Sequence, residues 1–201
     1  MAPTLANHAD RLNLRHAARG RLPPLILVTD RARLSDPVAA LDRLRPGDAV
    51  LLRDYDAPGR TALAAILARQ CRARRLRFLV AGDAQLARAV GADGIHLPEA
   101  MLARAPAIRG THPGFLITAA AHDAGALVAA ARAGADAALL SPVFATASHP
   151  GAPFLGVVRF AALVRGAKLP VYALGGIAGA TAARLSGTGA VGLAAIGAFA
   201  S

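Results

Sequence analysis

Two glycine-containing segments near the C-terminus could bind a phosphate group. Gly175-Gly176-Ile177 and Ile196-Gly197-Ala198 each follow a short apolar run. Glycine lets an anion approach the backbone closely, and consecutive backbone N–H groups are good donors to phosphate oxygens. Either segment alone could be an ordinary turn, but the two together predict a phosphate site. The residues expected to form it are Gly175, Gly176, Ile196 and Gly197.

Arg53 and His122 could act on a bound anion, because each stands at the end of an apolar run. A charge at the end of a buried strand is costly without an anionic partner. Arg53 could therefore face a ligand, and a salt bridge to Asp30, Asp54 or Asp56 is the alternative. His122 could serve as a base, since histidine changes its charge near neutral pH.

The segment Ser141–Gly156 is the longest connection in the chain and is rich in proline, glycine and small polar residues. Long loops in compact domains are usually functional or disordered. We expect this one to form a mobile lid over the site. His149, near its middle, could supply a cation or an acid–base group to a bound anion. A solvated loop histidine fits the sequence equally well.

Eight short apolar runs would have to position these residues, and the sequence predicts that they are parallel strands. The runs are nearly continuous in apolar residues, as expected for strands that are covered on both faces. They are Leu25–Thr29, Ala49–Arg53, Arg77–Ala81, Gly94–Leu97, Phe115–Ala119, Ala137–Leu140, Val171–Leu174 and Gly192–Ile196. Helices are expected between them at Pro37–Leu44, Arg60–Arg72, Ala84–Val90, Glu99–Ile108, Ala124–Ala133, Val157–Arg165 and Ala178–Ser186.

This alternation predicts the α/β class and a single (β/α)8 TIM barrel over residues 23–201, with residues 1–22 as an N-terminal arm. An open doubly wound sheet is the competing arrangement, but no G-x-G-x-x-G motif follows the first strand. In such barrels the active site lies at the C-terminal ends of the strands, and the loops after strands seven and eight commonly bind phosphate. The two glycine segments occupy those two loops.

The composition limits the classes of function. The chain has 201 residues, a formal net charge of +11 and one cysteine, Cys71, which excludes a disulfide framework and indicates a cytoplasmic protein. The sequence has no apolar run long enough for a membrane span. A basic protein can bind nucleic acid, but no aromatic side chains are interleaved with the arginines, so we expect no nucleic-acid partner.

Six segments of the chain match the thiamine phosphate synthase/TenI family in order and spacing. They are LVTD (Leu27–Asp30), LLRD (Leu51–Asp54), AVGADGIHL (Ala89–Leu97), SPVF (Ser141–Phe144), ALGGI (Ala173–Ile177) and Gly189–Phe199. The sequence therefore resembles this family over about residues 24–200. The resemblance implies a thiamine-biosynthetic barrel that joins hydroxymethylpyrimidine diphosphate to thiazole phosphate and releases pyrophosphate with Mg²⁺. It also implies a small phosphorylated substrate as the partner. Whether the chain forms a homodimer is left open by the sequence.

The resemblance assigns roles to several residues. The thiazole phosphate would lie against Gly175, Gly176, Ile196 and Gly197, where Gly197 replaces a usual serine. Arg53 matches the arginine that binds pyrophosphate in the family. Thr146 and Ser148 match hydroxyl positions in its mobile loop.

Other family positions have changed. A magnesium carboxylate is replaced by Gly82, the second magnesium aspartate by Met101, and the serine that contacts the pyrimidine by Ala120. Tyr55 and His149 stand where the family has lysines. Asp83 and Glu99 lie near the lost carboxylates and are the remaining candidate metal ligands, although Asp83 also suits a helix N-cap. The resemblance implies Mg²⁺, but its ligands are largely replaced.

The TenI branch of the family instead rearranges a double bond in thiazole phosphate. Its catalytic histidine falls on Pro142, so this branch is not a complete match either. Two classes of function stay open. The first, which we favour, is an enzyme that acts on thiazole phosphate with weakened or altered synthase activity, or with tautomerase activity. The second is a non-catalytic barrel that binds thiazole phosphate or thiamine phosphate.

Overall fold

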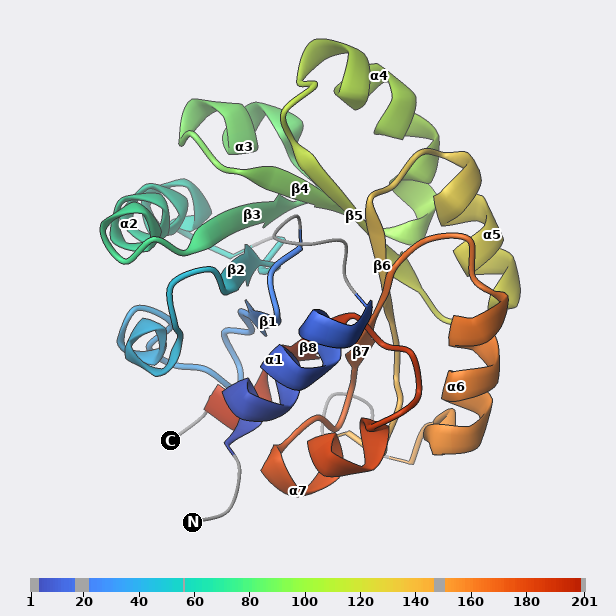
Figure 1. Ribbon diagram of the computed structural model, residues 1–201. Coiled ribbons are helices and arrows are strands. Elements are labelled where there is room, and N and C mark those ends of the chain that lie inside the picture. The colour runs from blue at the N-terminus through green and yellow to red at the C-terminus, as the bar shows by residue number, and fades with distance from the viewer. Residues whose placement is uncertain (1–3, 17–21, 56, 147–150, 200–201) are drawn as a thin grey trace.

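The computed structural model describes residues 4–16, 22–55, 57–146 and 151–199. Eight parallel strands close into one barrel in chain order, from β1 through β8 and back to β1 (Figure 1). The strands are β1 (Leu25–Val28), β2 (Ala49–Leu52), β3 (Arg77–Ala81), β4 (Gly94–Leu97), β5 (Leu116–Ala121), β6 (Ala137–Leu140), β7 (Val171–Leu174) and β8 (Gly192–Ala195). The predicted single (β/α)8 barrel is confirmed. Seven of the predicted apolar runs contain one of these strands, and the predicted run Phe115–Ala119 overlaps β5, which continues to Ala121.

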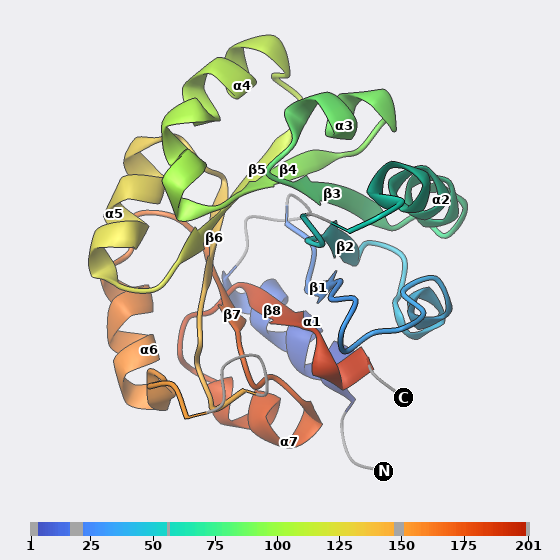
Figure 2. The ribbon, with the colours of Figure 1, turned by 180° about the vertical axis from the view of Figure 1, so that it is seen from behind.

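Helices surround the barrel on the outside, as the two opposite views show (Figures 1 and 2). They are η1 (Ala39–Arg43), α2 (Arg60–Ala73), α3 (Ala84–Ala89), η2 (Glu99–Arg104), α4 (Ala105–Thr111), α5 (Ala124–Arg132), α6 (Gly156–Gly166), α7 (Gly179–Ala182), η3 (Ala183–Leu185) and η4 (Gly197–Phe199). The strands are buried on both faces because side chains of one set pack under the helices and those of the other fill the barrel. Of the helices in the described ranges, none has the length and apolar character needed to cross a membrane.

Tyr172 on β7 is the largest side chain in the barrel interior and is fully buried. Its hydroxyl donates a hydrogen bond to the carbonyl oxygen of Pro23, at 2.7 Å, which satisfies the one polar group that it brings into the core. The neighbouring strand makes room for the ring with a glycine, since a Cβ atom at Gly192 would lie 2.6 Å from Cε1 of Tyr172. Side-chain packing therefore fills the barrel interior around Tyr172.

Helix α1 (Leu5–His16) lies against β1, β8 and α7. Leu12 is buried in the core that the helices share. Nδ2 of Asn13 donates to the carbonyl oxygens of Leu22, at 3.2 Å, and Val191, at 2.9 Å, just before β1 and β8 begin. The helix lies in front of β8 in Figure 1 and behind it in Figure 2. It covers the barrel at the N-terminal ends of the strands, so the opposite end is left for a site.

Candidate functional site

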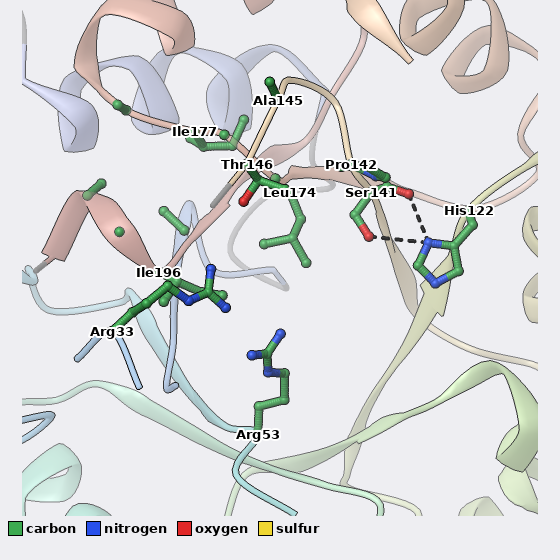
Figure 3. Close-up of a pocket in the computed structure, with 16 residues that line it drawn as sticks. Arg33, Arg53, His122, Ser141, Pro142, Ala145, Thr146, Leu174, Ile177 and Ile196 are labelled. Carbon is green, nitrogen blue, oxygen red and sulfur yellow. Dashed lines mark hydrogen bonds between the residues drawn. The ribbon is translucent and has the colours of Figure 1, made fainter. Parts of the chain in front are cut away.

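A cavity of about 330 Å³ opens at the C-terminal ends of the strands. Its walls come from the segments that follow β1, β2, β5, β6, β7 and β8 (Figure 3). A concave site with a few convergent polar groups at this end of a barrel is where ligands are expected. The predicted site residues that line it are Arg53, His122, Thr146, Gly175, Gly176, Ile196 and Gly197. Ser148 and His149 lie outside the described residues.

Gly175 and Gly176 need to be glycines because the segment after β6 lies against them. Their φ angles are +95° and +66°, a region that residues with a side chain rarely adopt. A Cβ atom at Gly175 would lie 2.7 Å from Cα of Pro142, and one at Gly176 would lie 2.4 Å from the carbonyl oxygen of Ala145. The N–H of Phe144 also donates to the carbonyl oxygen of Gly175, at 3.0 Å. The two segments therefore form one wall.

The glycine-containing segments after β7 and β8 both line the cavity. Within the described part of the chain, no protein acceptor is found for the N–H groups of Gly176, Ile177 and Gly197. The next N–H, that of Ala178, is used by the protein itself and donates to Oγ1 of Thr181 at 2.8 Å. Backbone N–H groups of glycine-rich turns are suitable donors to phosphate oxygens. The phosphate site at this position stays a prediction.

Two arginines also line the cavity. Figure 3 shows Arg33, which follows β1, and Arg53, which follows β2, with their guanidinium groups directed toward the middle of the cavity. Both guanidinium groups form ion pairs with the same carboxylate, that of Asp30. Burial raises the pKa of Asp30, but the hydrogen bond and charge of Arg33 and the charge of Arg53 outweigh it, so the pKa lies below its ordinary value. Of the two possibilities for Arg53, the salt bridge to Asp30 is present, and the side chain also lines the cavity.

The segments after β1 and β2 are held together by Asp54. Its carboxylate accepts a hydrogen bond from the hydroxyl of Thr29 and one from the N–H of Arg31, the latter at 2.7 Å. The Thr29 hydroxyl in turn accepts from the N–H of Arg53, at 3.1 Å. Because charge-assisted hydrogen bonds of this kind are strong, Asp54 acts as a structural support that fixes where the Arg53 side chain starts.

His122 lies on another side of the cavity, beside Ser141 (Figure 3). Its Nδ1 atom is 2.9 Å from the carbonyl oxygen of Ser141 and 3.5 Å from the Ser141 hydroxyl oxygen. A carbonyl can only accept, so Nδ1 carries the proton. In the neutral ring Nε2 is then unprotonated and can accept a hydrogen bond or a proton, as a general base must.

His96, at the end of β4, is a core residue. Its side chain is buried, and Nδ1 lies 3.0 Å from the hydroxyl of Thr118 on β5. Burial, with a smaller contribution from the charge of Arg53, lowers the pKa of His96 to about 4. The ring is therefore neutral at physiological pH.

The two candidate metal ligands do not come together. Asp83 caps helix α3 and accepts from the N–H of Leu86 at 2.8 Å. Glu99 is exposed at the start of η2. Among the residues that the structure describes, no group of three histidine, cysteine, aspartate or glutamate side chains could hold a metal ion. Mg²⁺ prefers one or two carboxylates besides phosphate oxygens, and neither of these carboxylates lines the cavity. The described residues therefore do not fit the metal that the sequence resemblance implies.

Arg33 is the cavity residue that the sequence did not single out. It stands three positions after Asp30, beyond the strand end where candidate residues were sought. The signal that could have found it is charge pairing, because a buried carboxylate at a strand end needs a cation and Arg33 can reach it across one turn.

Known proteins resemble the chain over most of its length. The sequence profile of the family described as thiamine monophosphate synthase matches residues 25–199. A thiamine-phosphate synthase of Methanoculleus marisnigri is 38% identical over 181 residues, which cover 87% of this chain and 86% of that protein. One of Coprothermobacter proteolyticus is 34% identical over 152 residues, 75% of this chain and 72% of that protein. The solved thiamine phosphate pyrophosphorylase of Pyrococcus furiosus is 29% identical, with a TM-score of 0.74 and coverage of 89% and 87% of the two chains. The chain belongs to the thiamine monophosphate synthase family.

Proposed function

We propose that the protein joins hydroxymethylpyrimidine diphosphate to thiazole phosphate, and that it forms thiamine phosphate and pyrophosphate. The observation that carries this proposal is the division of the cavity. The cavity is lined by the glycine-containing segments after β7 and β8, and also by Arg33 and Arg53 after β1 and β2. A reaction between two phosphorylated substrates requires two anion subsites, and we assign one to each of these two groups of residues.

The wall of Gly176, Ile177 and Gly197 holds the phosphate of the thiazole substrate. Fixed backbone dipoles bind an anion without a lysine or arginine there, and they need no reorganisation when the ligand arrives. The substrate is thereby anchored by its unreactive end, which leaves the thiazole nitrogen free to point into the cavity. Gly175 supports the same wall and shapes it.

Arg53 and Arg33 bind the diphosphate of the pyrimidine substrate. In the reaction the thiazole nitrogen forms a bond to the methylene carbon, while the bond from that carbon to the pyrophosphate oxygen breaks and the oxygen keeps the electron pair. Negative charge therefore grows on the departing pyrophosphate. Two guanidinium groups aimed at it stabilise the transition state more than the ground state, which is the condition for catalysis. One such group is typically worth about 10²–10³ in rate.

His122 and the loop after β6 complete the site. Nε2 of His122 is an acceptor, so this histidine can accept a hydrogen bond from the pyrimidine substrate. Thr146 lines the cavity and contributes to the pyrophosphate end, together with Ser148 and His149 of the same loop. In the tautomerase branch a histidine stands where this cavity has Pro142, and proline has no proton to exchange, which disfavours that reaction here.

The test is an assay of thiamine phosphate formation from the two substrates. The wild-type protein should form the product, and Arg53→Ala should lower kcat/KM by about 10²–10³ because one charge at the leaving group is lost. Arg132→Ala removes an exposed arginine on α5, far from the cavity, and should leave the rate unchanged. A wild-type protein that binds thiazole phosphate but forms no thiamine phosphate would refute the proposal.

A further inference from the structure

Three residues that depart from the family pattern lie together at neighbouring strand ends, with the side chains of Tyr55 and Met101 both beside Gly82. Tyr55 follows β2, Gly82 follows β3, and Met101 lies in η2 after β4. A Cβ atom at Gly82 would lie 3.1 Å from Cε1 of Tyr55 and 3.6 Å from Sδ of Met101. In the family, magnesium-binding carboxylates occupy the positions of Gly82 and Met101, and a lysine occupies the position of Tyr55. An aromatic ring, a thioether and a bare backbone thus occupy the place where charged ligands are expected.

A fixed cation lies against this cluster. Arg60 is the first residue of α2, and its side chain is only 12% exposed. Its guanidinium group donates to the carbonyl oxygen of Ala81 at 2.6 Å and lies 6.0 Å from the centre of the Tyr55 ring. A positive charge at a helix N-terminus opposes the helix dipole, so these contacts hold it in an unfavourable position. A divalent cation nearby would meet like charge.

Of the carboxylates that the structure describes near this cluster, Asp83 is engaged elsewhere and Glu99 is exposed. Asp83 accepts from the N–H of Leu86 as the cap of α3, and its other oxygen is 3.7 Å from Arg60. Coordination of a metal by Asp83 would give up the cap, which is worth about 1 kcal/mol in typical helices, and would bring the metal next to the guanidinium group. Glu99 is exposed in η2 and does not line the cavity.

We infer that this chain has exchanged the divalent-cation site of its family for the Tyr55–Gly82–Met101 cluster, and that it neutralises pyrophosphate with arginine and without a metal ion. The inference rests on the proposed function and deepens it, because it assigns the neutralisation of the leaving group to Arg33 and Arg53 without a metal ion. The cluster takes no part in charge neutralisation.

Metal binding tests the inference directly. Equilibrium dialysis against Mn²⁺, used as a probe for Mg²⁺, should leave the wild-type protein without bound metal. The double variant Gly82→Asp/Met101→Asp should bind about one equivalent, and the isosteric Gly82→Asn/Met101→Asn should bind none. Aspartate and asparagine tolerate the left-handed conformation of Gly82 better than most residues, and Tyr55 is partly exposed and can move. One equivalent of Mn²⁺ on the wild-type protein, lost in Asp83→Asn or Glu99→Gln, would overturn the inference.

Binding of inorganic pyrophosphate separates this inference from the proposed function. We expect the pyrophosphate-induced rise in Tm to be present in EDTA, unchanged by Mg²⁺ and abolished in Arg53→Ala. A rise that appears only with Mg²⁺ would contradict the inference and leave the proposed function intact. A rise that survives Arg53→Ala in both buffers, with no metal on the wild-type protein, would count against the proposed pyrophosphate site instead.

Discussion

Gly176 and Gly197 line the same cavity, but a side chain would meet different surroundings at the two positions. Gly176 has a φ of +66° and faces the carbonyl oxygen of Ala145. Gly197 has no such constraint, and a Cβ atom there would meet nothing within 4 Å. A substitution at Gly197 therefore changes the cavity without straining the backbone, so this residue is the better probe of phosphate binding.

Gly197→Asp should weaken the binding of thiazole phosphate at least about tenfold, because a carboxylate would stand beside the phosphate and repel it. Gly197→Asn has nearly the same shape without the charge and should bind close to the wild-type level. Both variants should melt within about 1 °C of the wild-type protein. Calorimetric titration with thiazole phosphate measures the effect, and equal affinities for the two variants would show that the phosphate lies elsewhere.

The sequence predicts side chains that end strands better than side chains that reach the site from a turn. Arg53 and His122 directly end or follow apolar runs, and both line the cavity. Arg33 enters from beyond the end of β1, and its position depends on the turn around Asp30, which periodicity does not reveal. The pairing of Arg53 with Asp30 is likewise a tertiary contact between two strands. Sequence spacing does not distinguish it from a pair with Asp54.

At the level of the elements, the segments after β6 and β7 form a single wall through backbone contact. The N–H of Val143 donates to the carbonyl oxygen of Leu174, at 2.9 Å, and the N–H of Phe144 donates to that of Gly175, at 3.0 Å. The close approach is possible because Gly175 and Gly176 have no side chains. Disturbing either glycine should therefore affect stability and ligand binding together.

Gly176→Ala should reduce stability by about 1–2 kcal/mol for the left-handed conformation, and by a further 1–3 kcal/mol or so for the contact with Ala145. Gly187→Ala is the matched control, since Gly187 has a φ of +80° and nothing within 4 Å of a Cβ atom. Gly187→Ala should therefore lose only the stability that the left-handed conformation costs. Urea denaturation measures both, and equal losses would mean that the close contact relaxes freely.

The strands were predictable because burial on both faces makes each of them a nearly continuous apolar run. The helices were harder to predict. The predicted helix Glu99–Ile108 is in fact η2 followed by α4. Pro106 lies in the first turn of α4, and because proline has no N–H it cannot continue a hydrogen-bond ladder begun earlier. Strand β5 extends to Ala121 because it pairs with Leu140 of β6, and a run of alanines does not by itself favour strand over helix.

Helix α1 is attached to the barrel by a side chain as well as by packing. Asn13→Ala should lower the free energy of unfolding by about 1–3 kcal/mol, because the partly buried carbonyl groups of Leu22 and Val191 lose their donor. Asn7→Ala on the same helix removes a hydrogen bond to Arg45 at the surface and should have a much smaller effect. Thermal and urea unfolding measure both losses. Equal losses for Asn13→Ala and Asn7→Ala would show that α1 is bound only by its apolar face.

At the scale of the whole molecule, two buried groups give opposite responses to acid. The pKa of His96 falls from 6.5 to about 4, so between these values the unfolded chain binds a proton that the folded protein excludes. Burial, with a smaller contribution from the charge of Asp10, raises the pKa of Asp48 from 3.8 to about 6, and there the folded protein holds the additional proton. As the pH is lowered, the titration of His96 therefore decreases the free energy of unfolding, and the titration of Asp48 increases it.

His96→Gln should remove the acid-induced loss, which amounts to at most about 3 kcal/mol, and its stability should decrease less than that of the wild-type protein between pH 7 and pH 4.5. Asp48→Asn should make the decrease steeper, because the compensating proton is gone. Urea denaturation at several pH values gives the slopes, and comparing slopes removes any constant loss caused by the substitution. Parallel curves for all three proteins would refute this assignment.

Asp30 has a consequence for which anions the mouth accepts. Its carboxylate already sits between the guanidinium groups of Arg33 and Arg53, and because it is attached to the chain its effective concentration there is high. Chloride or a simple carboxylate brings one negative charge, which is no more than Asp30 provides, so it gains little by displacing it. A diphosphate brings several charges at once and can engage both arginines. The resident carboxylate thereby makes the mouth selective for the valence of the anion, in favour of multivalent anions.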